Sequence, residues 1–177
     1  MRKAGWILAG LLAWGAAPVV AQESGQVGEL AQLLQLEDRR EFDLAALQRA
    51  AQDPDSLIRG QAALAVGRIG DQAGVPLLLR LLDDADTTVR AQAAFAMGML
   101  RDSAAAEELA RRVAALPDTA TGTDAVELVT ALCKTGGEAA ARAIEALLVR
   151  HPPTGPAADY ATGIGRASCR ERVYGTV

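Results

Sequence analysis

Arginine side chains recur at a constant spacing through the middle of the chain. Arg49, Arg80 and Arg111 follow one another at intervals of 31 residues. A guanidinium group presents a planar fork of hydrogen-bond donors that fits a carboxylate, so a row of arginines can bind an acidic peptide. These three residues therefore form a candidate partner-binding ridge. The alternative stays open at the level of sequence: they are solvated side chains that keep the surrounding helices soluble.

A second set of charges has the same spacing and a different character. Asp55 precedes Arg59 by four residues, and Asp86 precedes Arg90 by four residues. Residues four apart lie on the same face of a helix, so each carboxylate can meet the arginine one turn later. We predict a structural role for these residues, because paired charges at the ends of helices are ordinary surface features.

The remaining polar residues do not assemble into a catalytic or metal site. The acidic runs at 53–55 and 83–86 lack the glycine turn and the late glutamate of a calcium loop, so we interpret them as helix caps. His151 is the only histidine, and no partner constellation makes it a base. We therefore predict that this stretch of protein is not an enzyme and has no catalytic residue, metal or cofactor.

The elements that position these charges are repeats. Residues 53–67 are followed 31 residues later by a closely similar sequence at 84–98, and a fixed period of this size indicates stacked repeats. Gly67 and Gly98 occupy the same place in their units. A glycine in the middle of a helix costs about 1 kcal/mol relative to alanine, so its recurrence predicts close contact between neighbouring helices. Apolar residues fall on two helical stripes per unit, which in the first copy are Ile58, Ala62, Ala65, Val66 and Ile69, then Val75, Leu78, Leu79 and Leu82.

Two less regular units extend this pattern on either side. A fourth unit covers residues 125–149, after a connection at 116–124 that holds four extra residues. We predict an all-α solenoid of about four helix pairs across residues 22–150, since imperfect end units are expected where a stack meets water. The two stripes of the first, degenerate unit are predicted to be Val27, Leu30, Ala31 and Leu34, then Leu44, Leu47 and Ala51.

The repeated sequence resembles the short HEAT repeats, including those described as phycobilisome-lyase HEAT-like. The shared pattern is Asp-x-Asp-x-x-Val/Ile-Arg, then Ala-Ala-x-Ala-x-Gly, then Gly-Asp and a leucine-rich helix, as at residues 53–82. The resemblance implies a right-handed α-solenoid whose second helices line the concave face. It also implies that Arg59 and Arg90 tie each repeat to its neighbour, and that the protein binds a protein or peptide partner.

The first 21 residues are predicted to be a signal peptide. Arg2 and Lys3 are followed by an almost wholly apolar stretch, and small or permissive residues end at Ala21, before Gln22. This pattern favours secretion over a membrane anchor, because the apolar run is too short to span a bilayer. We expect a periplasmic or secreted monomer without membrane attachment after cleavage. The net charge of −4 becomes more negative when the signal is removed, which argues against nucleic acid as a partner.

The C-terminal residues differ in kind from the repeats. Residues 151–163 form a Pro/Gly-rich tail, and residues 164–173 resemble a translated sequencing adapter. We interpret residues 164–177 as a non-native, disordered tail and expect the natural protein to continue differently.

Two functions remain open. The first is an exported HEAT scaffold, represented here by an N-terminal fragment. The second rests on a finer resemblance, because residues 33–44 and 131–137 are similar to the N-terminal region of exported bacterial proteins that end in a cyclophilin-type prolyl isomerase. The chain would then be the non-catalytic arm of a longer enzyme, since no cyclophilin motif lies within its 177 residues.

Overall fold

The computed structural model describes residues 17–120 and 122–150, and side chains from residue 25 onward. Within these residues the regular structure is helical and no strand occurs, so the prediction of an all-α solenoid of about four helix pairs is confirmed. The predicted signal sequence up to residue 16 and both predicted tail segments lie outside the described residues. The pairs are α1 (Ala17–Arg39) with α2 (Leu44–Ala50), α3 (Ser56–Ile69) with α4 (Val75–Leu81), α5 (Thr87–Leu100) with α6 (Ala106–Ala114), and α7 (Thr123–Thr135) with α8 (Gly137–Arg150).

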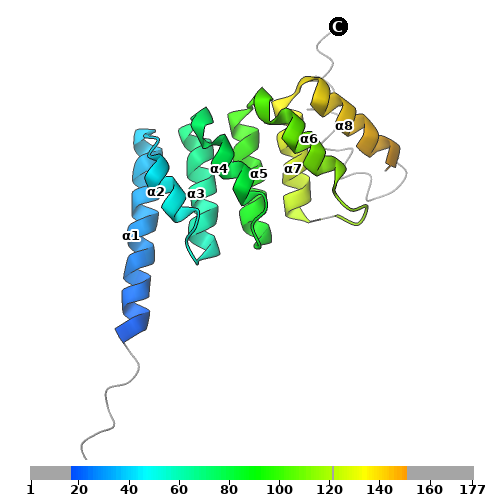
Figure 1. Cartoon of the computed structure of the whole chain (residues 1–177). Helices are drawn as coiled ribbons and strands as arrows, with labels where there is room; N and C mark the ends of the chain where they lie inside the picture. Colours follow the sequence, from blue (N-terminus) through cyan, green and yellow to red (C-terminus); the bar gives the residue numbers. More distant parts are fainter. Residues whose placement is uncertain (1–16, 121, 151–177) are drawn as a thin grey trace, which may run out of the picture.

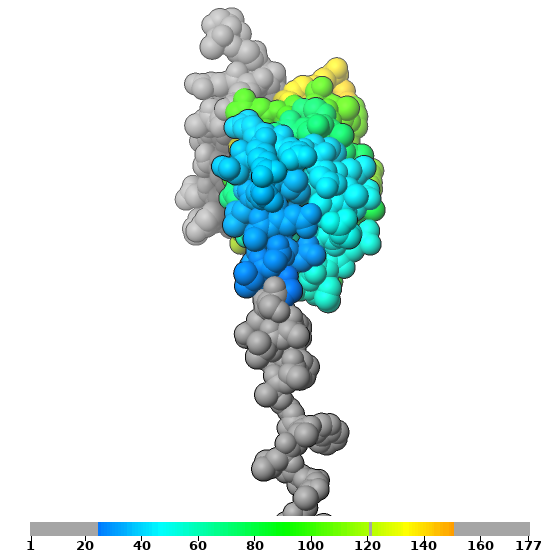
Figure 2. All heavy atoms as spheres, turned by 90° about the vertical axis from the view of Figure 1, so that its left-hand side faces the viewer, coloured from blue at the N-terminus to red at the C-terminus, as the bar shows by residue number. Residues whose placement is uncertain are grey.

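The first helices of the four pairs stand side by side in chain order (Figure 1). In this row α1 packs on α3, α3 on α5, and α5 on α7. The shorter second helices α2, α4 and α6 lie over one side of the row, and α8 packs on α6. Figure 2 looks along the stack from its α1 end, where α1 and α2 form the exposed terminal layer. The fold is therefore a linear array in which each repeat contacts its neighbours.

An aspartate caps at least one helix or helical turn in each of the first three repeats. Each cap residue has an extended backbone, and its carboxylate accepts a hydrogen bond from a backbone N–H in the first turn, which satisfies a donor that has no partner within the helix. The short 3₁₀ turns η1 (Gln72–Gly74) and η2 (Ser103–Ala105) are capped in the same way. Of the two acidic runs, Asp55 and Asp86 therefore serve as helix caps, whereas Asp83 and Asp84 accept hydrogen bonds from arginines. The capping residues are Asp43, Asp55, Asp71, Asp86 and Asp102.

Small residues bring the first helices of successive repeats together. A Cβ placed on Gly67 would lie 2.9 Å from both Cα and Cβ of Ala96 in the next repeat. A Cβ on Gly98 would lie 3.2 Å from the Cα of Ala131. At these separations a larger side chain would have to displace a neighbouring backbone, so the two glycines set the distance between α3, α5 and α7.

The stripe predicted for α1 is wrong in detail. Val27 is 66% exposed and Leu34 is 57% exposed, whereas Leu33 and Leu36 are buried. The turn after α1 has its positive-φ residue at Arg40, four positions before α2, whereas Gly70 precedes α4 by five positions. Residues of α1 therefore align with residues of α3 that lie 30 positions later, one fewer than the repeat period of 31. A shift of one residue turns a helix by about 100° and buries a different stripe.

Helix α1 extends beyond the predicted start of the solenoid. Its bounds begin at Ala17, so the predicted cleavage position before Gln22 falls within the helix. Two hydrogen bonds hold α1 against α3: Gln26 Nε2 donates to Asp55 Oδ2 at 2.7 Å, and Arg68 Nη1 donates to Glu37 Oε2 at 2.7 Å.

Candidate functional site

Arg59 joins the second repeat to the third. Its Nε donates to Asp84 Oδ2 at 2.7 Å and its Nη2 donates to Asp84 Oδ1 at 2.8 Å. Its Nη1 donates to the carbonyl of Asp53 at 2.9 Å, inside its own repeat. The expected pairing of Arg59 with Asp55 is therefore wrong. The Asp55 carboxylate caps α3 through the N–H of Leu57 and accepts from α1, so the arginine extends forward to the next repeat instead.

The electrostatics of this contact, which we call the Arg59–Asp84 clamp, suit a fixed structural link. The Arg59 side chain is 17% exposed and that of Asp84 is 9% exposed. The hydrogen bond from Arg59 holds the pKa of the Asp84 carboxyl below its usual range. Asp84 Oδ1 also accepts from the backbone N–H of Asp86 at 2.8 Å, so the carboxylate is fixed from two sides.

Arg90 repeats the arrangement with a different partner. Its Nη1 donates to the carbonyl of Asp84 at 2.9 Å, as Arg59 does to Asp53, while its Nε donates to Asp124 Oδ2 at 2.9 Å. The predicted partner Asp86 instead caps α5 through the N–H of Thr88. Asp124 lies in the first turn of α7, after the long connection. Asp84 instead precedes the first residue of α5 by three positions, so the two carboxylates occupy different places in their repeats.

The candidate ridge residues lie on the second helices and are exposed to solvent. Arg49 is on α2, Arg80 on α4 and Arg111 on α6. Across the described part of the chain, Arg49 and Arg80 form no ion pair, whereas Arg111 Nε donates to Glu108 at 2.9 Å. The structure therefore leaves two of the three arginines with unpaired charges and neutralises the third.

Arg112 is a linking residue that the sequence analysis missed. Its Nη2 donates to Asp83 Oδ2 at 2.8 Å and its Nε donates to Glu108 Oε1 at 2.7 Å. The contact joins α6 to the end of the preceding repeat, and the hydrogen bond from Arg112 lowers the pKa of Asp83. The equivalent positions one and two repeats earlier hold Leu81 and Ala50, so no periodic signal marked this residue.

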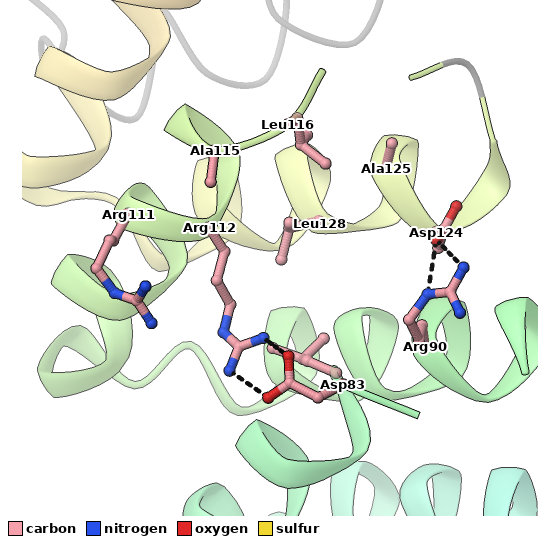
Figure 3. A pocket seen from close by; sticks show the side chains of 10 residues that line it. Asp83, Arg90, Arg111, Arg112, Ala115, Leu116, Asp124, Ala125 and Leu128 are labelled. Carbon is pink, nitrogen blue, oxygen red and sulfur yellow. Dashed lines mark hydrogen bonds and ion pairs between the residues drawn. The ribbon is translucent and has the colours of Figure 1, made fainter. Parts of the chain in front are cut away.

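A cleft of about 400 Å³ opens between the third and fourth repeats (Figure 3). Eight residues, 115–122, connect α6 to α7, compared with five, 82–86, between α4 and α5. Arg112 points toward Asp83 on one side of the cleft, Arg90 points toward Asp124 on the other, and Arg111 stands apart from both pairs. The apolar part of the lining comprises Leu82, Ala115, Leu116, Ala125 and Leu128.

The repeat geometry and the comparisons with known proteins agree. A family model for HEAT repeats matches residues 29–98 and 44–128, which together span more than half of the chain. The chain belongs to the HEAT-repeat family. HEAT repeats commonly mediate contacts between proteins and provide no catalytic machinery of their own. A comparison with curated proteins finds no match.

In this HEAT stack the charged residues fall into two groups. Arg59, Arg90 and Arg112 are held by carboxylates of adjacent repeats, so their charges are used within the fold. Arg49 and Arg80 are exposed on α2 and α4, two of the B helices, as we call the second helices of the HEAT pairs, and form no ion pair within the described residues. The cleft between the third and fourth repeats is lined in part by Arg111 and Arg112 near the end of α6.

Two absences can be stated for the residues that the structure describes. No group of three or more His, Cys, Asp or Glu side chains in this part of the chain could hold a metal ion. None of its helices is both long and apolar enough to cross a bilayer.

Proposed function

We propose that this protein is an exported HEAT scaffold that binds an acidic segment of a partner protein through Arg49 and Arg80. One observation carries the proposal: these two arginines occupy the same position on consecutive B helices, are exposed, and form no ion pair within the described residues. An unpaired guanidinium retains its full capacity for a bidentate contact with a carboxylate. Export is supported by the signal-like pattern of the first 21 residues.

The repeat spacing suggests the form of the bound segment. The first helices of consecutive repeats pack on one another, and packed helices lie about 8–10 Å apart, so equivalent side chains on consecutive repeats have a similar separation. A polyproline II chain rises about 9 Å over its three-residue turn, and every third side chain then lies on the same face. A segment of this conformation with an acidic residue at every third position would match Arg49 and Arg80.

Fluorescence anisotropy tests this proposal with a defined probe. The probe is a fluorescein-labelled peptide with glutamate at every third position and proline or serine between, compared with a peptide of the same composition whose glutamates are contiguous. We expect the spaced peptide to bind more tightly. The variant Arg49→Glu with Arg80→Glu should lose this binding.

A matched control separates the ridge from overall charge. The variant Arg39→Glu with Arg101→Glu changes the net charge by the same amount at exposed positions outside the B-helix ridge. It should retain binding. Equal loss in the two double variants would reduce the effect to nonspecific electrostatics and would refute the ridge.

A second proposal concerns the parent protein. The similarity of residues 33–44 and 131–137 to exported cyclophilin-type isomerases supports a role as the non-catalytic arm of such an enzyme. Sequencing the locus across the codons for residues 160–177 tests it. A cyclophilin reading frame downstream would support the arm, and further HEAT units or an early stop would support the scaffold alone.

A further inference from the structure

The cleft between the third and fourth repeats combines an aliphatic floor with a charged rim. Leu82 and Leu128 are buried and Leu116 is half-buried, and all three line the cleft. The cleft occurs at the junction with the eight-residue connection, while Gly98 still holds α5 against α7 at the other end of these helices. Its volume of about 400 Å³ lies within the range of ligand pockets, about 300–1,000 Å³.

The charges around the cleft leave one cation for a ligand. Arg90 forms an ion pair with Asp124, and Arg112 forms one with Asp83. Arg111 is the remaining cation of the lining, and its side chain is 68% exposed. Its partner Glu108 also binds Arg112, so Glu108 keeps an ion pair when Arg111 turns away. An exposed pair between residues three apart contributes little to stability, and a ligand carboxylate can therefore replace Glu108 at low cost.

From this we infer that the cleft is an anchor pocket for an aliphatic side chain of the acidic partner segment, with the adjacent carboxylate bound by Arg111. The inference rests on the proposed function and names a second point of attachment for the same ligand. Leu82 and Asp83 of the cleft directly follow α4, which carries Arg80, so the pocket adjoins the proposed ridge along the chain. The chemistry is complementary, because an aliphatic group fills the leucine floor while a single negative charge meets the single available guanidinium.

The test compares two labelled peptides in anisotropy titrations of the whole chain. Both carry the spaced glutamates, and they differ only in a leucine or a serine next to the last glutamate. The free energy gained by burying a leucine side chain is at least as large as the free energy that changes affinity tenfold. We therefore expect the leucine peptide to bind about tenfold more tightly than the serine peptide. Arg111→Gln should weaken the leucine peptide severalfold. Equal affinities of the two peptides for the unmodified protein would overturn the anchor pocket.

A filling variant and its neighbour provide the matched control. Ala115 is exposed and lines the cleft, so Ala115→Trp should occupy the pocket without disturbing the core and remove the preference for leucine. Ala114 is also exposed but does not belong to the lining, so Ala114→Trp should retain the preference. Persistence of the leucine preference in Ala115→Trp would also overturn the pocket.

The two proposals fail in distinguishable ways. If binding of the serine peptide depends on Arg49 and Arg80 but leucine adds nothing, the anchor pocket is wrong and the ridge stands. If neither peptide depends on Arg49 and Arg80, the proposed function itself is wrong.

Discussion

Removing the guanidinium of the Arg59–Asp84 clamp should destabilise the stack more than any comparable change on its surface. We choose Arg59→Met, which keeps most of the aliphatic stem and removes the charge. The loss comprises two hydrogen bonds to Asp84 and one each to the carbonyls of Asp53 and Pro54. Hydrogen bonds to charged groups contribute about 1.5–3 kcal/mol, and orphaning one partner of a fully buried ion pair costs about 3–5 kcal/mol.

The exposure of the pair decides between these ranges. Arg59 is 17% exposed and Asp84 is 9% exposed, so the clamp is mostly but not fully removed from water. We expect Arg59→Met to lower the free energy of unfolding by about 2–3 kcal/mol. Arg90→Met should cost less, about 1 kcal/mol, because Arg90 and Asp124 are 29% and 24% exposed and water compensates more of the lost contact.

Urea unfolding followed by circular dichroism at the helical band measures both values. Arg80→Met, at an exposed and unpaired arginine, is the control and should leave the unfolding midpoint unchanged. A double-mutant cycle with Asp84→Ala isolates the pairwise contribution of Arg59 and Asp84. If Arg59→Met and Arg90→Met were equally destabilising, burial would not control the strength of the clamps and the reasoning would be refuted.

The same clamp makes a signed prediction for pH. The pKa of Asp84 is lower in the folded protein than its ordinary value, chiefly because Arg59 donates to it. A carboxyl with a depressed folded pKa adds stability above its unfolded pKa of about 4, and that stability disappears as pH falls through the folded pKa. Asp84→Asn should therefore flatten the loss of stability below about pH 4, with little effect on its slope near neutrality.

Two further predictions concern the seam and the N-terminus. Gly67→Val should destabilise the protein by about 1–3 kcal/mol, because its Cβ would meet Ala96 and force α3 and α5 apart. Gly28→Val in α1, where a Cβ meets nothing within 4 Å, should not have this effect. Thermal unfolding of the two variants checks this, and similar melting temperatures would contradict the close contact between α3 and α5. Mass spectrometry of the protein expressed from its full reading frame should find an N-terminus at Gln22, and an intact Met1 in the membrane fraction would exclude signal cleavage.

Much of the fold could be predicted because the same spacing of apolar and small residues occurs in more than one repeat. The stripes of the second repeat, with Ile58 and Leu78 fully buried, followed directly from helical periodicity. Periodicity failed in α1, where the turn at Arg40 shifts the register by one residue and leaves Leu34 exposed. A pattern learned from the central units carries no information about a change in turn length at the end of the stack.

The charged contacts were less accessible to sequence reasoning. Spacing within a helix suggested Asp55 as the partner of Arg59, but a cap carboxylate is already engaged by backbone N–H groups, so the arginine binds Asp84 in the next repeat. The link through Arg112 and the adjoining cleft depend on residues that occur in one repeat alone. Such features arise from contacts between distant segments, which neither propensity nor periodicity encodes.

The direction of the clamps has a consequence for how such an array can grow. Asp84 accepts from the arginine of the repeat before it, and Arg90 in the same unit donates to the repeat after it. The same repeat thus contains the acceptor for the preceding repeat, Asp84, and the donor to the following repeat, Arg90. A gene duplication that inserts a copy of this unit would supply a carboxylate for Arg59 of the preceding unit and for the arginine equivalent to Arg90 in each copy. Adding such a unit inside the stack therefore keeps these arginine–aspartate contacts between repeats paired, whereas ending the stack after α4 would leave Arg59 without Asp84.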